Sequence, residues 1–140
     1  MLHTIFNEWT QLKTQTPTIV LIERDEVTLD LYRRELSKSF AVLAFTEITG
    51  VLETMANQDI QAVVIEPEIH SGKGWELIRS IHNVLPYRTI PIIVCSTSDT
   101  HIQDFRGAVA KYLTKPVLPK TLREKTLEIV KEKARLRNTA

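Results

Sequence analysis

Polar side chains of three kinds stand where short apolar runs of the sequence end. Glu66 follows one run, Ser96 follows a second, and Lys115 follows a third. Each is weak evidence by itself, because charged residues at strand ends usually face solvent. A carboxylate, a hydroxyl and an ammonium group gathered at one edge are a far more specific combination. Glu66 is then a reactive group, the remnant of one, or only a polar residue at a strand end.

More charged residues follow the first apolar run, which covers residues 18–22. Glu23, Arg24, Asp25 and Glu26 stand there in succession. Asp25 and Glu26 have a plainer interpretation, since acidic groups support the first turn of a following helix through its dipole. Asp25 nevertheless remains a neighbouring acid for any site at this edge.

Five apolar runs predict the strands that must position these residues. Most runs are continuous rather than alternating, which is typical of strands buried on both faces in a parallel sheet. Amphipathic segments of helical period separate them. The predicted strands are residues 18–22, 41–45, 62–65, 90–95 and 111–114, and the predicted helices are residues 27–36, 48–57, 74–85, 101–110 and 118–137.

This alternation predicts an α/β fold with a doubly wound (βα)5 parallel sheet. Right-handed crossovers between parallel strands place helices on both faces of such a sheet. Sites in this fold class lie at the carboxyl ends of the strands, near the topological switch point. Glu66, Ser96 and Lys115 are all placed at such ends.

Composition and charge narrow the function classes. The chain has 140 residues, which suits one compact domain, and a formal net charge of +1, which gives no case for nucleic-acid or membrane binding. The lone Cys95 excludes an internal disulfide and fits a reducing cytoplasm. No run approaches the roughly 20 apolar residues of a membrane span. No secretory signal is expected.

Several enzyme motifs are missing from the sequence. The first strand is not followed by G-x-G-x-x-G, no phosphate-binding loop or G-x-S-x-G elbow is present, and the four histidines form no pair at metal-ligand spacing. His70 and His101 are expected to be plain surface residues. These observations argue against a dinucleotide enzyme, a hydrolase and a histidine metal site.

An N-terminal extension, residues 1–16, precedes the first strand and is expected to be helical. Its apolar residues follow helical spacing: Leu2, Ile5, Phe6, Trp9 and Leu12. Three roles are open, namely a helix packed on the domain, a dimerisation helix and the end of a linker.

Over roughly residues 17–132, the chain resembles the receiver domain of bacterial two-component response regulators. The stretches that carry the resemblance are "VLIERDEVTLDLYRREL", "VVIEPEIHSGKGWELIRSI", "IPIIVCSTS" and "AVAKYLTKP". The resemblance implies a receiver-like domain over residues 17–140 with a flavodoxin-like three-layer sandwich. In receivers an aspartate after the third strand accepts a phosphoryl group from a histidine kinase, and two acids after the first strand help it to hold Mg²⁺.

The resemblance also implies roles for single residues. A hydroxyl contacts the phosphoryl oxygen, a lysine before a cis proline pairs with the acceptor, and an aromatic residue changes rotamer between states. The matching residues are Glu66 at the acceptor, Glu23 and Arg24 at the acidic pair, Ser96 at the hydroxyl, Lys115 before Pro116, Tyr112 at the switch aromatic and Gly74 at the glycine eight residues after the acceptor.

The departures from the receiver pattern decide the functional prediction. Arg24 replaces one acid, Glu66 replaces the acceptor aspartate, and Pro67 removes a backbone donor beside it. The predicted pocket is neutral, with Glu23 and Glu66 balanced by two basic residues, and an inward Arg24 would take the space of a metal ion. We therefore expect no Mg²⁺, no other cofactor and no enzymatic activity.

Glu66 then has two possible roles. The favoured interpretation is a plain ion pair with Arg24 or Lys115. The alternative is a fixed mimic of the phosphorylated acceptor, held by Ser96 and Lys115, with Tyr112 in an active-like rotamer.

The predicted function is that of a pseudo-receiver in a cytoplasmic phosphorelay, independent of phosphorylation and acting through protein–protein contacts. The expected partner is a signalling protein, either a histidine kinase or an effector, bound through about residues 99–136, with no membrane and no direct nucleic-acid contact. Two alternatives remain open. One is a working receiver that uses Asp25 or a shifted pocket. The other is an oligomerisation module that forms a homodimer through residues 1–17 and the last helix.

Overall fold

The five predicted strands form one parallel sheet. The computed structural model describes residues 16–98 and 101–139. The strands are β1 (Thr18–Ile22), β2 (Ala41–Phe45), β3 (Ala62–Ile65), β4 (Ile92–Ser96) and β5 (Lys111–Thr114), in the order β2-β1-β3-β4-β5. The chain moves outward from β1 to β2 and then returns to the other side of β1, so the topological switch point lies between β1 and β3. The predicted doubly wound sheet is confirmed.

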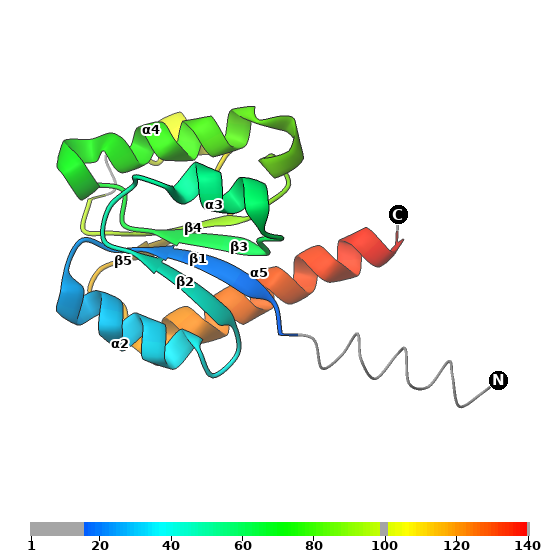
Figure 1. Cartoon of the computed structure of the whole chain (residues 1–140), viewed down its shortest axis with the longest axis horizontal. Coiled ribbons are helices and arrows are strands. Elements are labelled where there is room, and N and C mark those ends of the chain that lie inside the picture. The colour runs from blue at the N-terminus through cyan, green and yellow to red at the C-terminus, as the bar shows by residue number, and fades with distance from the viewer. Residues whose placement is uncertain (1–15, 99–100, 140) are drawn as a thin grey trace.

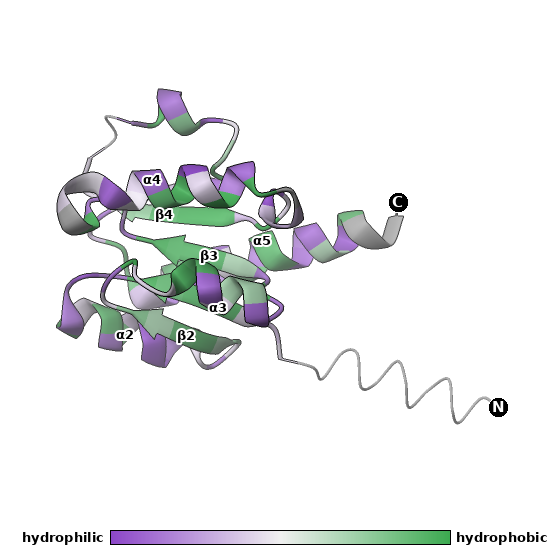
Figure 2. Ribbon diagram, turned by 45° about the horizontal axis from the view of Figure 1, so that its top comes forward, coloured by the Kyte–Doolittle hydropathy of each residue, from purple (hydrophilic) through white to green (hydrophobic). Residues whose placement is uncertain are grey.

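Helices cover both faces of this sheet (Figure 1). On one face, α2 (Glu26–Leu36) and α5 (Pro119–Thr139) pack on Ile19, Leu21 and other strand residues. On the opposite face lie α3 (Val51–Asn57) and α4 (Ile69–Asn83). The strands are largely hydrophobic and the helices carry hydrophilic outer faces, as Figure 2 shows. The three-layer arrangement follows from that distribution, because each sheet face must be buried against an apolar helix face.

The predicted helix at residues 101–110 is wrong. In the described part of the connection between β4 and β5, the only helical element is one 3-10 turn, η2 (Gln103–Phe105). Gly107 lies inside the predicted helix, and glycine costs about 1 kcal/mol relative to alanine in a helix interior. Phe105 is buried against the α4 side of the sheet instead. One anchored aromatic residue replaces an amphipathic helix at this place.

The helix predicted at residues 74–85 begins earlier than expected. α4 starts at Ile69, close behind Glu66, and ends at Asn83. Its first turn is irregular, with positive φ values of 57° at Ser71 and 92° at Gly72. The sequence "EPEIHSGKG" was interpreted as a loop because proline, serine and glycine usually mark one.

The predicted N-terminal extension falls almost wholly on residues 1–15, which lie outside the described residues. Among the described residues, no helix has both the length and the apolar character needed to cross a membrane.

Candidate functional site

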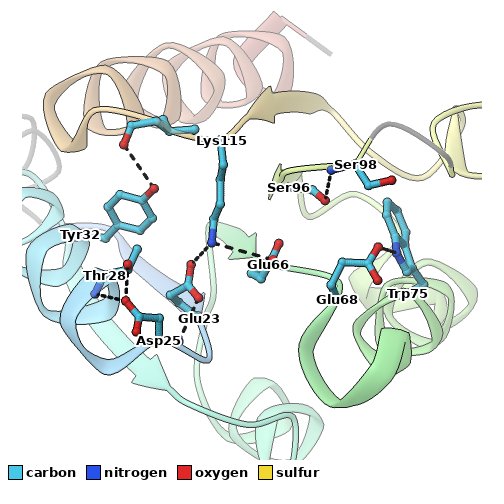
Figure 3. Close-up of polar contacts among 11 residues, drawn as sticks. Glu23, Asp25, Thr28, Tyr32, Glu66, Glu68, Trp75, Ser96, Ser98 and Lys115 are labelled. Atoms are coloured by element: carbon cyan, nitrogen blue, oxygen red, sulfur yellow. Dashed lines mark hydrogen bonds and ion pairs between the residues drawn. The ribbon is translucent and has the colours of Figure 1, made fainter.

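The sheet itself brings the candidate residues together. Backbone hydrogen bonds continue the ladders past the strand ends, from Glu66 N to Ile22 O (2.9 Å) and from Lys115 N to Ser96 O (2.9 Å). In the same way Glu23 N donates to Phe45 O at 3.0 Å. Because each residue is fixed to a neighbouring strand, their side chains meet at one carboxyl edge (Figure 3).

The centre of the site is the ammonium group of Lys115. It donates to Glu23 Oε1 and lies 3.8 Å from Glu66 Oε1. The side chains of Glu23 and Glu66 are only 2% and 4% exposed, and that of Lys115 is 17% exposed. These three residues form the Glu23–Lys115–Glu66 cluster. Its two carboxylates share one cation, so the buried charge is not fully neutralised.

Glu23 is the better-satisfied acid of the two. Besides the bond from Lys115, its Oε2 accepts a hydrogen bond from Asp25 N at 3.1 Å. Both carboxylate oxygens therefore have a donor. Glu23 thus acts as the main counter-ion of Lys115.

Glu66 is less well satisfied. Its Oε2 atom is buried and has no hydrogen-bond partner among the described residues. Burial raises the pKa of Glu66, and the nearby Glu23 charge raises it further, while Lys115 acts in the opposite direction. The carboxylate at the acceptor position is therefore held in surroundings that favour its protonated form.

The carboxylate of Asp25 takes no part in the cluster. Its carboxylate caps α2 and accepts hydrogen bonds from Thr28 N at 3.0 Å and Thr28 Oγ1 at 2.5 Å. These bonds hold the pKa of Asp25 below its ordinary value. Asp25 therefore has the structural role considered from the sequence, which is to support the first turn of the following helix.

Arg24 does not take the inward position in which its guanidinium would occupy the space of a metal ion. The residue is exposed, whereas Glu23 beside it is buried. Successive residues of an extended chain point to opposite sides, so burying Glu23 turns Arg24 outward. Of the two cations proposed as partners for Glu66, Lys115 is the one that forms the pair.

Ser96 and Tyr112 lie near the edge but make other contacts. Ser96 is buried, and its Oγ accepts a hydrogen bond from Ser98 N at 3.1 Å. The Tyr112 hydroxyl donates to Ile102 O at 3.4 Å and so ties β5 to the segment before η2. The Lys115–Pro116 peptide bond is cis, as the resemblance implied.

A second group of contacts, which sequence reasoning missed, starts two residues after Glu66. Glu68 Oε1 accepts a hydrogen bond from Trp75 Nε1 at 3.1 Å (Figure 3). The Trp75 ring packs on Phe105 and His101, with centroid distances of 4.7 and 4.9 Å. Positions 68 and 75 are seven residues apart, and that spacing puts two residues on one helix face. This signal was missed because the helix was expected to begin only at Gly74.

Gly74 explains how α4 can start so close to the cluster. A Cβ atom at this position would lie 2.5 Å from Pro67 O and 2.6 Å from Pro67 Cα. Real side chains do not tolerate such contacts. Only glycine lets the helix pack against the backbone that carries Glu66.

Several solved structures have a fold similar to that of this chain. The receiver domain of a CheY-like response regulator from Methanospirillum hungatei is 19% identical, with a TM-score of 0.77 over 86% of this chain and 98% of that one. A response regulator receiver domain from Clostridium thermocellum is 20% identical, with a TM-score of 0.74, covering 86% and 98% of the two chains. A sensor protein from Polaromonas is 22% identical, with a TM-score of 0.75, covering 85% and 99%.

These solved structures confirm the predicted fold. The chain has the α/β, flavodoxin-like fold of CheY-like receiver domains. No family model matches the sequence, and no curated protein matches it. The likeness therefore concerns the fold, and the function has to be argued from the site.

Proposed function

We propose that this chain is a receiver-like signalling domain of a two-component phosphorelay whose output does not depend on phosphorylation. The observation that carries the proposal is the Glu23–Lys115–Glu66 cluster. In a receiver the corresponding lysine serves the acceptor. Here it bonds first to Glu23 and only more distantly to Glu66.

The donor set does not fit a magnesium ion. Mg²⁺ needs oxygen ligands in near-ideal octahedral geometry. In the described part of the chain, Lys115 pairs with two carboxylates at the pocket, those of Glu23 and Glu66, and Asp25 is engaged in capping α2. Among the described residues, no group of three or more acidic, histidine or cysteine side chains is arranged to hold a metal. We infer that this domain works without Mg²⁺ or any other cofactor and catalyses no reaction.

The acceptor position is also altered. A glutamate carboxylate reaches about 1.5 Å further than that of aspartate, and phosphoryl transfer depends on positioning and charge compensation. Pro67 has no backbone N–H to donate beside it. The proposal therefore treats Glu66 as the remnant of an acceptor.

Between the two roles open to Glu66, the geometry favours the ion pair over the mimic. A mimic needs both Ser96 and Lys115 as partners, yet Glu66 Oε2 has no hydrogen-bond partner among the described residues and Lys115 Nζ lies 3.8 Å from Oε1. The mimic also needs Tyr112 to respond to Glu66. A crystal structure of Glu66→Gln in which Tyr112 has moved would support the mimic, whereas an unmoved Tyr112 agrees with the ion pair.

We place the domain in the cytoplasm and propose a protein as its partner, either a histidine kinase or an effector. The buried, unpaired thiol of Cys95 suits a reducing compartment. The near-neutral net charge of +1 gives no footprint for nucleic acid. The expected contact surface around residues 99–136 now includes η2 in place of a helix.

A working receiver is the second candidate, and one observation favours it. Glu66 Oε2 is buried but has no hydrogen-bond partner among the described residues, so a local opening of the site would leave it available to attack a phosphodonor. Intact mass after incubation with acetyl phosphate and Mg²⁺ separates the candidates. We expect no gain in mass and no saturable change in Trp75 fluorescence up to about 10 mM Mg²⁺. One added phosphoryl group that Glu66→Gln abolishes would establish the working receiver instead.

A further inference from the structure

A groove of about 570 Å³ lies at the opposite end of the sheet from the Glu23–Lys115–Glu66 cluster. Its walls are the segments just before β4 and β5 and the second half of α5. Apolar side chains contribute to these walls, among them Ile90, Val109, Ile129 and Leu136. The groove therefore offers an apolar surface at the amino edge of the sheet.

This surface exists because α5 is longer than the sheet that it covers. The helix has 21 residues, so it extends about 32 Å, whereas a strand of five residues spans about 17 Å. Its far half projects past the sheet (Figure 1), with hydrophobic and hydrophilic residues still alternating along it (Figure 2). Residues at helical spacing along one face of α5 become more exposed toward its end. Leu122 and Thr126 are fully buried, Ile129 and Lys133 are half-buried, and Leu136 is 51% exposed.

The described chain begins at this same edge. Pro17 O accepts a hydrogen bond from Ala41 N at 2.9 Å, and Thr18 O accepts one from Gln61 N at 2.8 Å. β1 and β4 are separated only by β3. Neighbouring strands are about 4.8 Å apart, so the groove starts about 10 Å from β1. Fifteen residues span about 22 Å as a helix and can reach along it.

We propose that residues 1–15 of the same chain occupy this groove. Their apolar residues Leu2, Ile5, Phe6, Trp9 and Leu12 recur at helical spacing, which is the pattern that packs against an apolar stripe. The attachment point favours the chain's own segment over a second copy, because a short tether gives an effective concentration in the millimolar range. The segment then covers Leu136 and joins the two ends of the chain into one unit.

Thiol reactivity in the full-length chain tests the proposal. Leu136→Cys places a thiol in the groove, and Leu118→Cys places one on the other edge of the sheet, where Leu118 is 72% exposed. Cys95 is 2% exposed and contributes only a slow background. The residues at both sites are more than half exposed, so without docking the introduced thiols should react at similar rates with a thiol reagent. Docking should slow Leu136→Cys by roughly tenfold relative to Leu118→Cys.

A matched pair of substitutions tests whether residues 1–15 cause the slower reaction of Leu136→Cys. Phe6→Asp puts a charge into the apolar stripe of the segment, and Asn7→Asp puts the same charge on its polar side. Phe6→Asp should restore the fast rate of Leu136→Cys, and Asn7→Asp should not. Circular dichroism of each variant checks the fold. Equal rates at the two thiols, or protection that Phe6→Asp leaves intact, would overturn the proposal. Protection that disappears on dilution would also overturn it, because it would identify a second copy as the occupant.

Discussion

The ammonium group of Lys115 bonds the carboxylate of Glu23 and thereby joins the ends of β5 and β1, two strands that have β3 and β4 between them. Both side chains are largely withdrawn from water, at 17% and 2% exposure. Surface pairs such as Arg33–Asp30 are much more exposed. Pairs of that exposed kind contribute about 0–1 kcal/mol, whereas breaking a buried pair leaves an uncompensated charge. The buried pair between Lys115 and Glu23 should therefore matter more for stability than the surface pairs.

Removing the shared cation should destabilise the protein strongly. Lys115→Met leaves Glu23 and Glu66 buried beside each other without a counter-ion, so the free energy of unfolding should fall by about 3 kcal/mol. Urea unfolding at pH 7 measures it. Lys120→Met removes an exposed lysine from the start of α5 and should change the free energy by less than about 0.5 kcal/mol. Equal effects of the two substitutions would contradict a stabilising role for the cluster.

The two glutamates of the cluster should differ in their contribution. Glu23→Gln removes the main counter-ion of Lys115 and should cost about 3 kcal/mol. Glu66→Gln removes a more distant charge whose Oε2 lacks a partner among the described residues, so its effect should stay within about 1 kcal/mol. Urea unfolding of the two isosteric variants gives the comparison. The reverse order would show that Lys115 mainly serves Glu66.

Glu66 should also make the stability depend on pH in a defined direction. Its pKa is raised in the folded protein above the ordinary value of 4.5, so the folded state holds the proton more tightly. The stabilisation is complete below the unfolded-state pKa and is lost as the pH rises through the folded-state pKa. The free energy of unfolding of the wild type, minus that of Glu66→Gln, should therefore decrease with increasing pH. Carboxyl ¹³C shifts of Glu66 measure the pKa directly, and a pKa below 4.5 would contradict the prediction.

Gly74 should be intolerant of even one added methyl group. In Gly74→Ala the new Cβ would meet Pro67 O at 2.5 Å. We expect α4 to shift and the free energy of unfolding to fall by about 1–3 kcal/mol. Gly107→Ala is the matched control, because its Cβ would meet no atom within 4 Å. That variant should be neutral or gain up to about 1 kcal/mol through the unfolded state. Similar losses at both positions would rule out the contact with Pro67 as the cause.

Two substitutions together should restore receiver chemistry if the site matching is right. Arg24→Asp replaces a cation that acts on Glu66 with an acid at the position where the receiver pattern has one, and Glu66→Asp draws the acceptor back by about 1.5 Å from Lys115. The double variant should bind Mg²⁺ and gain one phosphoryl group from acetyl phosphate, and each single variant should do less, since changes within one site are non-additive. Intact mass and Trp75 fluorescence provide the readouts. A folded double variant that gains neither property would show that these positions do not form a receiver pocket.

The sheet could be predicted from the sequence because its strands are continuous apolar runs. Four of the five strands have the predicted bounds, and β4 begins at Ile92 instead of residue 90, since Pro91 has no N–H for the ladder. The meeting of Glu23, Glu66 and Lys115 followed from the topology alone. Side-chain direction was harder to predict. Whether Arg24 turns inward or outward could not be decided, because the sequence does not show which of two adjacent residues faces the pocket.

Irregular segments were predicted least well. The segment 101–110 has enough apolar residues to suggest a helix, yet it is held by tertiary contacts such as that of Phe105 with Trp75, at 4.7 Å between ring centroids. The start of α4 was missed for the opposite reason, because its breaker residues are accommodated by positive φ values at Ser71 and Gly72. Tertiary packing overrode local preference in both places.

The lysine that a phosphorylated acceptor would recruit is already held by carboxylates of its own chain. If the proposed function is right, this domain has one signalling state rather than two, because it is neither phosphorylated nor dephosphorylated. The output of such a domain depends only on its concentration and on whether the binding site of its partner is available. The pathway is then controlled by synthesis and degradation of the domain and by competition for its partner. The response increases gradually with the concentration of the domain and does not switch between two levels.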